Sequence, residues 1–207
     1  MKRATTPLIA TCWTTNSISS LHLGDHIHES PLKTAPVRRH AHGELFTLSD
    51  YRTHFAQYRS DPDLLAAHAA CPWLMVWDDH EVENDYAAAH SQNVDDPSWF
   101  LRRRANAYRA YYEHMPLPRT VTPCGPDMRI YTGVEYGMLA RFTLMDGREY
   151  RSPQPWAPFG RGGANRIENC AARLDEHATL LGAQQEQWFG GQMRSTQARW
   201  TWLVNSC

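Results

Sequence analysis

The segment 78–81, with the sequence Asp-Asp-His-Glu, combines three carboxylates and an imidazole within four residues. Adjacent carboxylates raise each other's pKa unless a cation is present, and a multivalent metal ion is the usual reason for such crowding. The apolar residues 73–77 precede it, as is typical of a strand buried on both faces of a parallel sheet. Ligands bind beyond the carboxyl ends of such strands, so we interpret 78–81 as part of a site. The alternative is a polar loop in which Asp78 or Asp79 caps a helix.

A second polar segment, residues 24–29, follows a short stretch at 21–23 in which apolar and polar residues alternate. Gly24 lets the backbone turn, so Asp25 is expected at the carboxyl end of a second strand. His26 and His28 come next. Imidazole with carboxylate suits zinc, iron or manganese, whereas carboxylate with carbonyl oxygen suits calcium or magnesium. A single histidine is more often a surface or core residue, but two acidic strand ends favour a metal site.

The composition fits a globular chain with a real hydrophobic core, as one large domain or two small ones. Of the 207 residues 42% are hydrophobic, with 8 Trp and 9 Tyr. The net charge of −1 gives no indication of a nucleic-acid-binding module, and no apolar run approaches the roughly 18 residues of a membrane span. Five scattered cysteines without CxxC spacing indicate neither a disulfide framework nor a zinc finger. We predict no signal peptide, because the N-terminal apolar stretch is shorter than about 7 residues.

Helices are predicted before and after the central segment. Thr47 and Asp50 form a capping pattern, a second helix is expected over 62–70 because Pro72 stops it, and a third runs from Trp99 to about Met115. The arginines at 102–104 are interpreted as a solvent-exposed face of that third helix.

From Met128 the period of the apolar pattern changes to two. Residues 129–134 and 136–144 are predicted to pair as strands around a turn near Glu135, followed by a helix over 183–193 and a last strand over 199–204. Asp146, Arg148 and Tyr150 are expected to form an ion pair that supports the core, rather than to take part directly in catalysis.

Strings along the chain, in matching order and spacing, resemble the PhoD-like alkaline phosphatases of the calcineurin-like metallophosphoesterase superfamily. They are LGDHIHE at 23–29, RRHAHGE at 38–44, TLSDYR at 47–52, DPDLLAAHAACPW at 61–73, WDDHEVEND at 77–85, MDGREYRS at 145–152 and LGAQQEQW at 181–188. The resemblance covers about residues 21–205. It implies an α/β fold of the four-layer αββα sandwich type, here incomplete. Residues 1–20 would be a degenerate N-terminal segment, and 21–207 a partial domain truncated at both ends.

The resemblance also implies metal ligands. Asp25 would bridge two cations and Asp79 would bind the second. Cys12 lies in a segment similar to the family's metal-binding cysteine segment, but it is only 13 residues from Asp25, and a small buried thiol is the alternative. His28 stands where the family has an iron-binding tyrosine, and its neutral ring would shift the site away from ferric iron. The implied cofactors are calcium and iron, with manganese or zinc as alternatives. A further departure from the family pattern is Asp85, which stands where the family has an asparagine.

The implied activity is hydrolysis of phosphomonoesters or phosphodiesters by a metal-bound water. His80 would sit near the leaving oxygen, and Arg38 or Arg39 would hold the phosphate, unless they form a solvated basic loop. The alternatives are a catalytically inactive truncated fragment and a metal-binding module without hydrolytic activity. Family members are commonly exported by the twin-arginine route, but no such signal is visible here, so the compartment stays open.

Overall fold

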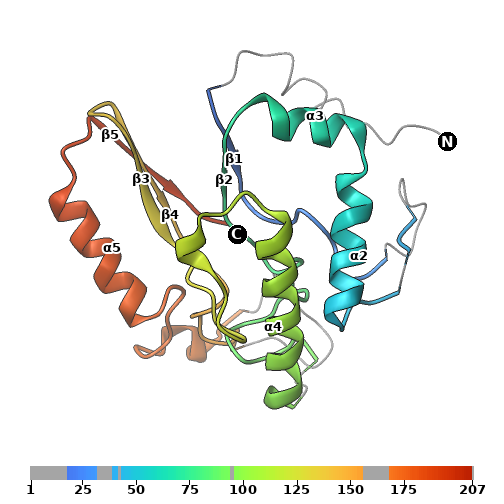
Figure 1. Ribbon diagram of the computed structural model, residues 1–207. Helices are drawn as coiled ribbons and strands as arrows, with labels where there is room; N and C mark the ends of the chain where they lie inside the picture. Colours follow the sequence, from blue (N-terminus) through green and yellow to red (C-terminus); the bar gives the residue numbers. More distant parts are fainter. Residues whose placement is uncertain (1–17, 32–38, 42, 94–95, 156–167, 207) are drawn as a thin grey trace.

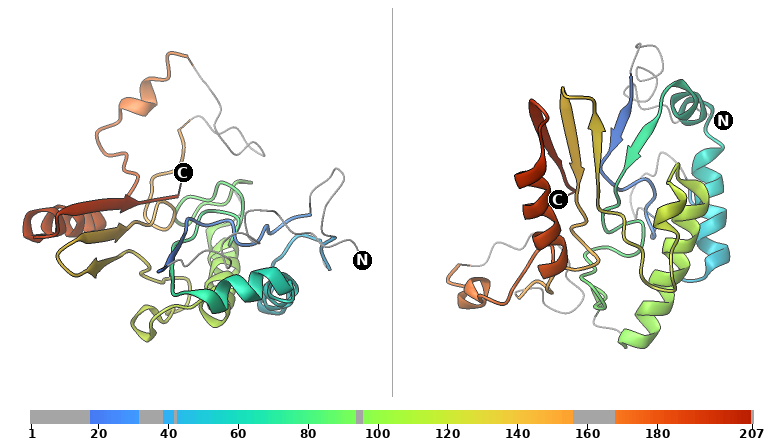
Figure 2. Two further views of the ribbon diagram at one scale, coloured as in Figure 1. Left: turned by 90° about the horizontal axis from the view of Figure 1, so that it is seen from above. Right: turned by 60° about the vertical axis from the view of Figure 1, so that its left-hand side comes forward.

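The computed structural model describes residues 18–31, 39–41, 43–93, 96–155 and 168–206, and it places two small β-sheets between helices (Figure 1). Helices α2, α3 and α4 lie on one side of the pair of sheets and α5 lies on the other, an arrangement that two further views repeat (Figure 2). The elements, in order, are β1 (Ser20–His22), α2 (Leu48–Arg59), α3 (Pro62–Ala70), β2 (Trp73–Met75), α4 (Pro97–His114), β3 (Thr132–Tyr136), β4 (Ala140–Leu144), α5 (Ala183–Ser195) and β5 (Trp200–Val204). The described part is therefore a mixed α/β fold.

The first sheet pairs β1 with β2 in parallel, so both strands end at the same edge. Ser20 lies opposite Trp73 and His22 opposite Met75. The ladder continues with one bond beyond β2, from the Val76 amide to the carbonyl of His22 at 3.0 Å, and the chain then leaves the sheet. The regular strand is thus shorter than the predicted run of 73–77, because the last two residues already lead into the polar segment.

Side chains of the segment 73–77 alternate between two apolar clusters. Trp73, Met75 and Trp77 belong to the cluster shared with the helices, whereas Leu74 and Val76 contact the second sheet through Leu144 and Val204, among other residues. The interpretation of this run as a strand with two buried faces is therefore confirmed.

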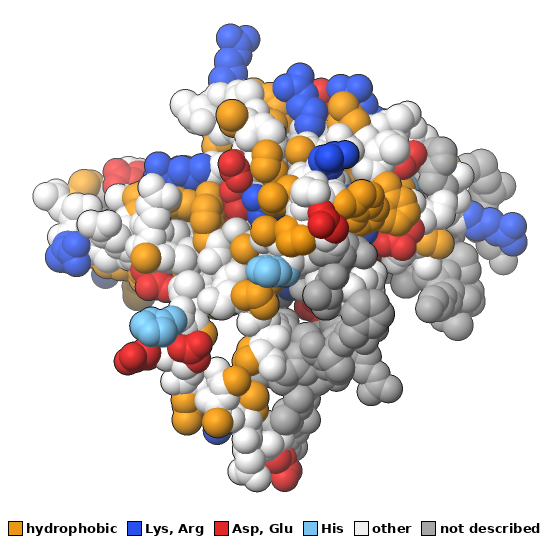
Figure 3. Space-filling view, turned by 90° about the horizontal axis from the view of Figure 1, so that it is seen from below, with side chains coloured by type: hydrophobic (Ala, Val, Ile, Leu, Met, Phe, Trp, Pro, Cys, Tyr) orange, Lys and Arg blue, Asp and Glu red, His pale blue; other side chains and the backbone are white. Residues whose placement is uncertain are grey.

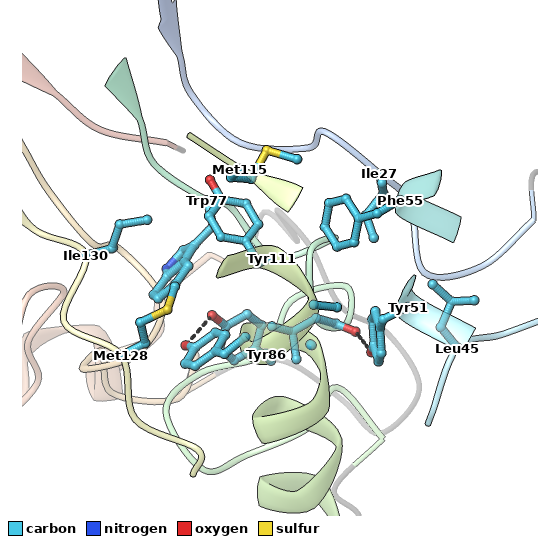
Figure 4. Close-up of a cluster of buried hydrophobic side chains, with 14 of the residues drawn as sticks. Ile27, Leu45, Tyr51, Phe55, Trp77, Tyr86, Tyr111, Met115, Met128 and Ile130 are labelled. Atoms are coloured by element: carbon cyan, nitrogen blue, oxygen red, sulfur yellow. Dashed lines mark hydrogen bonds between the residues drawn. The ribbon is translucent and has the colours of Figure 1, made fainter. Parts of the chain in front are cut away.

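The larger cluster is aromatic and lies between the first sheet and helices α2 and α4 (Figure 4). Trp77 stacks on Tyr108 with ring centroids 4.3 Å apart. The buried hydroxyls also have partners: Tyr51 donates to the carbonyl of Val82 at 2.6 Å, and Tyr86 and Tyr108 share a bond of 3.0 Å. This packing anchors the chain on both sides of residues 78–81, because Trp77 and Val82 are fully buried.

The second sheet has the order β3-β4-β5, with β3 antiparallel and β5 parallel to β4. Its first turn lies at Gly137, whose φ of +54° favours glycine, and not near Glu135 as predicted. Helix α5 covers the sheet on the side away from β1 and β2 (Figure 2). Gln185 of α5 bonds to both the amide and the carbonyl of Asp146, so the helix holds the turn that follows β4.

Helix starts agree with the capping signals in the sequence. Thr47 and Asp50 form a capping box, and Asp61 and Asp96 cap α3 and α4 through their side chains. The prediction that residues 102–104 form a solvent-exposed face is wrong for two of the three arginines. Arg103 and Arg104 are buried, because α4 turns them toward acceptors on neighbouring loops.

The surface seen from below carries acidic, basic and apolar side chains interspersed with one another (Figure 3). Among the described side chains on that face, charges of the two signs lie close to one another (Figure 3). None of the described helices is long and apolar enough to cross a membrane.

Candidate active site

Three side chains that can bind a metal converge at the carboxyl ends of β1 and β2. One ligand atom each from Asp25, Asp79 and His80 lies within 4.8 Å of the other two. Asp79 is buried, His80 is half-buried and Asp25 is exposed. Carboxylate oxygens with an imidazole form a donor set that suits iron, manganese or zinc, so these residues fit a metal ion.

Gly24 allows the two strand ends to approach each other. A Cβ atom at this position would lie 2.2 Å from the amide nitrogen of Asp78 and 2.6 Å from its Cβ. The φ of Gly24 is +103°, and Asp25 itself adopts a left-handed backbone with a φ of +57°. Only glycine meets both demands at position 24, and it places the Asp25 carboxylate beside Asp79.

Glu81 links the two strand ends through hydrogen bonds to their backbone amides. Its buried carboxylate accepts from the backbone amide of His26 at 2.5 Å and from that of Asp78 at 2.9 Å. Burial raises the pKa of Glu81 to about 7, against the lowering effect of these amide donors. Glu81 is therefore a positioning residue. It bonds to the backbone of the two segments that carry the candidate metal ligands, and not to the ligand side chains themselves.

Arg148, from the turn after β4, holds three carboxylates of the polar segment. Its guanidinium lies 2.6 Å from Asp78, 3.5 Å from Asp79 and 3.4 Å from Asp85. The Asp85 amide also donates to the Asp79 carboxylate at 2.6 Å. Arg148 was expected to pair with Asp146 and Tyr150 of its own turn. Its guanidinium instead pairs with the segment 78–85, and the Asp146 carboxylate accepts from the backbone amide of Arg148 at 2.8 Å.

Burial raises the pKa of two carboxylates at this site, Asp78 and Asp25. The pKa of Asp78 is raised to about 6, because desolvation outweighs the attraction of Arg148. The pKa of Asp25 is also raised, first by burial, with Asp79 adding to the effect and His80 opposing it. A cation at this position would relieve that cost, which is further reason to consider a metal site.

His80 is paired with a buried glutamate. Its Nδ1 lies 2.6 Å from an oxygen of Glu29, and the other oxygen of Glu29 accepts from the Asn84 amide at 3.2 Å. Burial disfavours the charged ring, but the hydrogen bond and charge of Glu29, with the charges of Asp79 and Asp25, raise the pKa of His80 to about 9. The contact with Glu29 thus favours the charged form of the ring, in which Nε2 is the other N–H donor.

His28 lies against His80, with ring centroids 4.1 Å apart and planes inclined by 47°. Burial and the charge of His80 lower the pKa of His28. Within the described residues, His28 does not belong to the converging group of three. Its role as a ligand stays a prediction.

The remaining predicted site residues lie away from this group or outside the described part. Arg39 is exposed, and its carbonyl accepts from Gln57 of α2 at 2.7 Å. None of the ion pairs among the described residues joins Arg39 to Asp25, Asp79 or His80. Cys12 and Arg38 fall outside the described residues.

Sequence reasoning did not assign roles to Glu29 and Glu81. Both are acidic residues within a few positions of a predicted donor, and both are buried. A buried carboxylate requires partners, so an acid beside a strand end is a signal for a positioning residue.

The fold and the site together define a class: mixed α/β proteins in which the acidic strand ends of a parallel sheet bring together side chains that can bind a metal. The family model of PhoD-like phosphatases matches residues 15–207, so the chain belongs to this family. It is 46% identical over 188 residues to alkaline phosphatase D of Bacillus subtilis (strain 168), which covers 88% of this chain and 31% of that protein. A solved structure of PhoD superimposes with a TM-score of 0.85 at 42% identity, over 94% of this chain and 37% of the solved one. The chain therefore spans about a third of the length of these relatives.

Proposed function

We propose that this chain carries the active-site core of a metal-dependent hydrolase of phosphomonoesters or phosphodiesters, as the name of its relative, alkaline phosphatase D, suggests. One observation carries the proposal: Asp25 and Asp79 converge with His80, whose Nδ1 lies 2.6 Å from Glu29. The reaction needs metal ligands and a proton donor side by side, and these residues supply both.

Asp25 and Asp79 are proposed to hold the metal ions, and His80 to act as the acid. His80 could bind a metal only through a neutral ring, because a protonated imidazole has no lone pair for a metal. In the proposed role as acid, His80 would leave metal binding to the two carboxylates. When bound, the metals would supply a water of lowered pKa and would stabilise charge on the phosphoryl oxygens. We infer calcium and iron, with manganese or zinc as alternatives, and we retain His28 and Cys12 as candidate ligands.

Hydrolysis forms a bond between phosphorus and the oxygen of water, and breaks the bond to the ester oxygen, which leaves with the electron pair. His80 would give its Nε2 proton to that oxygen, and the proton lost by water would restore the imidazolium. Glu29 keeps the ring in place during this exchange through the bond to Nδ1. Arg39 and Arg38 are proposed to hold the phosphate through bidentate bonds.

The complete fold is proposed to be the four-layer αββα sandwich, of which residues 21–207 form part of one domain. The order of α5, the three-stranded sheet, the two-stranded sheet and helices α2–α4 in Figure 1 supports this view.

The test is hydrolysis of bis-para-nitrophenyl phosphate and para-nitrophenyl phosphate at alkaline pH, with calcium plus iron, with manganese, or with EDTA. We expect metal-dependent turnover that His80→Ala removes, while the matched variant His177→Ala, at an exposed position, retains it. Equal turnover in wild type and His80→Ala would contradict the proposal. Metal binding is measured separately by metal analysis of wild type and Asp25→Asn, because binding without turnover would indicate a non-hydrolytic module or an inactive fragment.

A further inference from the structure

A cavity of about 280 Å³ lies directly beside the candidate active site and shares His80 with it. Besides Ser30 and His80, its wall contains three glutamates and three amide side chains: Glu29, Glu44, Glu83, Asn84, Gln92 and Asn93. Within the described part of the chain, no lysine, arginine or apolar side chain lines it. The volume is below the roughly 300–1,000 Å³ of sites for drug-sized ligands, so its occupant is small.

The wall of the cavity is held in place by contacts of its own. The Asn84 amide side chain donates to Gln92 at 2.8 Å, and the Asn84 backbone amide donates to Glu29 at 3.2 Å. Behind the wall, the buried guanidinium of Arg103 contacts Glu83 at 2.7 Å and Glu44 at 3.0 Å. The acceptor groups are therefore oriented before any ligand enters, which lowers the cost of binding.

The charges around the cavity do not cancel. Among the described residues, three carboxylates of the wall face one guanidinium, Arg103, and one imidazole, His80. Their summed charge is negative whether or not His80 is protonated, and the space has many acceptor oxygens. An anionic group would be repelled there, and an alkyl group would leave desolvated polar atoms without partners. A primary ammonium supplies three donors and the opposite charge.

We propose that this cavity receives the alcohol released from the phosphoester and favours an alcohol that carries a primary ammonium group. The inference rests on the proposed function, because His80 is the residue that would protonate the leaving oxygen and it forms part of the wall of this cavity. Glu44 is the specificity-determining residue, because its side chain is more exposed than that of Glu83, the other glutamate paired with Arg103.

The first test compares two esters of the same shape at neutral pH, O-phosphoethanolamine and n-propyl phosphate, which differ only in an ammonium or a methyl group. We expect kcat/KM to favour O-phosphoethanolamine by about 5-fold in the wild type and by little in Glu44→Gln. Glu176→Gln, at an exposed position outside the cavity, is the matched control and is expected to keep the preference. The proposal would be overturned by equal values of kcat/KM for the two esters, or by the same preference in Glu44→Gln. A stronger preference for glycerol 1-phosphate would also overturn it.

The second test does not depend on turnover. Ethanolamine and propan-1-ol are titrated into the protein, and the side-chain amide signals of Asn84 and Gln92 are followed by NMR. We expect ethanolamine alone to shift them, and Glu44→Gln to weaken the effect. Selective shifts without turnover of any ester would support the cavity assignment and overturn the proposed hydrolysis. If ethanolamine shifts these signals no more than propan-1-ol does, the assignment is overturned whatever the turnover.

Discussion

The Nε atom of Arg148 lies 2.6 Å from the carboxylate of Asp78, although 70 residues separate them in the chain. This bond joins the turn after β4 to the end of β2, and so it links the second sheet to the first. The same guanidinium also faces Asp79 and Asp85, so one buried cation orients the segment that carries a proposed metal ligand. The geometry of the site therefore depends on how the two sheets are packed.

Replacing Arg148 by methionine should destabilise the fold and weaken metal binding together. The change leaves the half-buried Asp78 and the buried Asp79 without their cation, and breaking a buried pair costs about 3 kcal/mol or more. Arg109→Met is the matched control, because Arg109 forms an exposed pair with Glu113 on one helix, for which a loss of about 0.5 kcal/mol is expected. Urea unfolding of the two variants measures this difference, and equal losses would contradict the role given to Arg148.

Replacing Gly24 by alanine should separate the strand ends. The new Cβ would meet the backbone of Asp78 at 2.2 Å, which cannot move aside as a flexible side chain would. We expect lower stability and loss of metal affinity, measured by thermal unfolding and by metal titration. Gly191→Ala in α5 is the control: no atom lies within 4 Å of the added Cβ, and a gain of about 0.5–1 kcal/mol is expected from helix propensity. Unchanged metal affinity in Gly24→Ala would show that the close approach is not needed.

Residues whose roles follow from local sequence could be predicted, whereas those that act across the fold could not. An apolar run followed by acids marks a strand end, so the pattern alone places Asp25 and the segment 78–81 at strand ends, whereas the metal roles of Asp25 and Asp79 come from the family resemblance. The capping pattern of Thr47 and Asp50 likewise predicts the start of α2. Glu29 pairs with His80 across 51 residues of sequence, and no spacing rule predicts such a distance.

The arginines of α4 are a second example of residues whose environment local sequence does not predict. Three consecutive basic residues usually indicate a solvent-exposed surface, because charge is costly to bury. Arg103 is nevertheless buried, because Glu83 and Glu44 supply its partners from loops whose positions only the packed structure reveals.

Glu149 should contribute a loss of stability as pH rises from about 4.5 to 8. Below about pH 6.5 this loss is opposed by His22, His26 and His68, whose pKa values burial lowers. Burial, with the charge of Asp146 adding to it, raises the pKa of Glu149 to about 8. The folded state then holds a proton that the unfolded state has released, so unfolding is favoured as pH rises through this window. Glu149→Gln should remove this contribution, on the order of 1 kcal/mol per pH unit, measured by urea unfolding of the variant and the wild type at several pH values. The same pH dependence in the variant and the wild type would mean that Glu149 is ionised in the folded protein.

Replacing His28 by alanine should decide whether this ring binds a metal or only packs on His80. A ligand or its direct support typically contributes about 10- to 100-fold in metal affinity, so we expect a loss of that size if His28 is a ligand. The ring lies 4.1 Å from that of His80 and close to the charge of Asp25, which places it within reach of a metal held by Asp25. The measurement is titration with iron(II) and manganese, followed by metal analysis after dialysis. His90→Ala, at an exposed histidine outside the group of donors, is the control and should bind as the wild type does. Affinity that is equal in His28→Ala and the wild type would contradict the prediction and leave the ring a packing role beside the proposed acid.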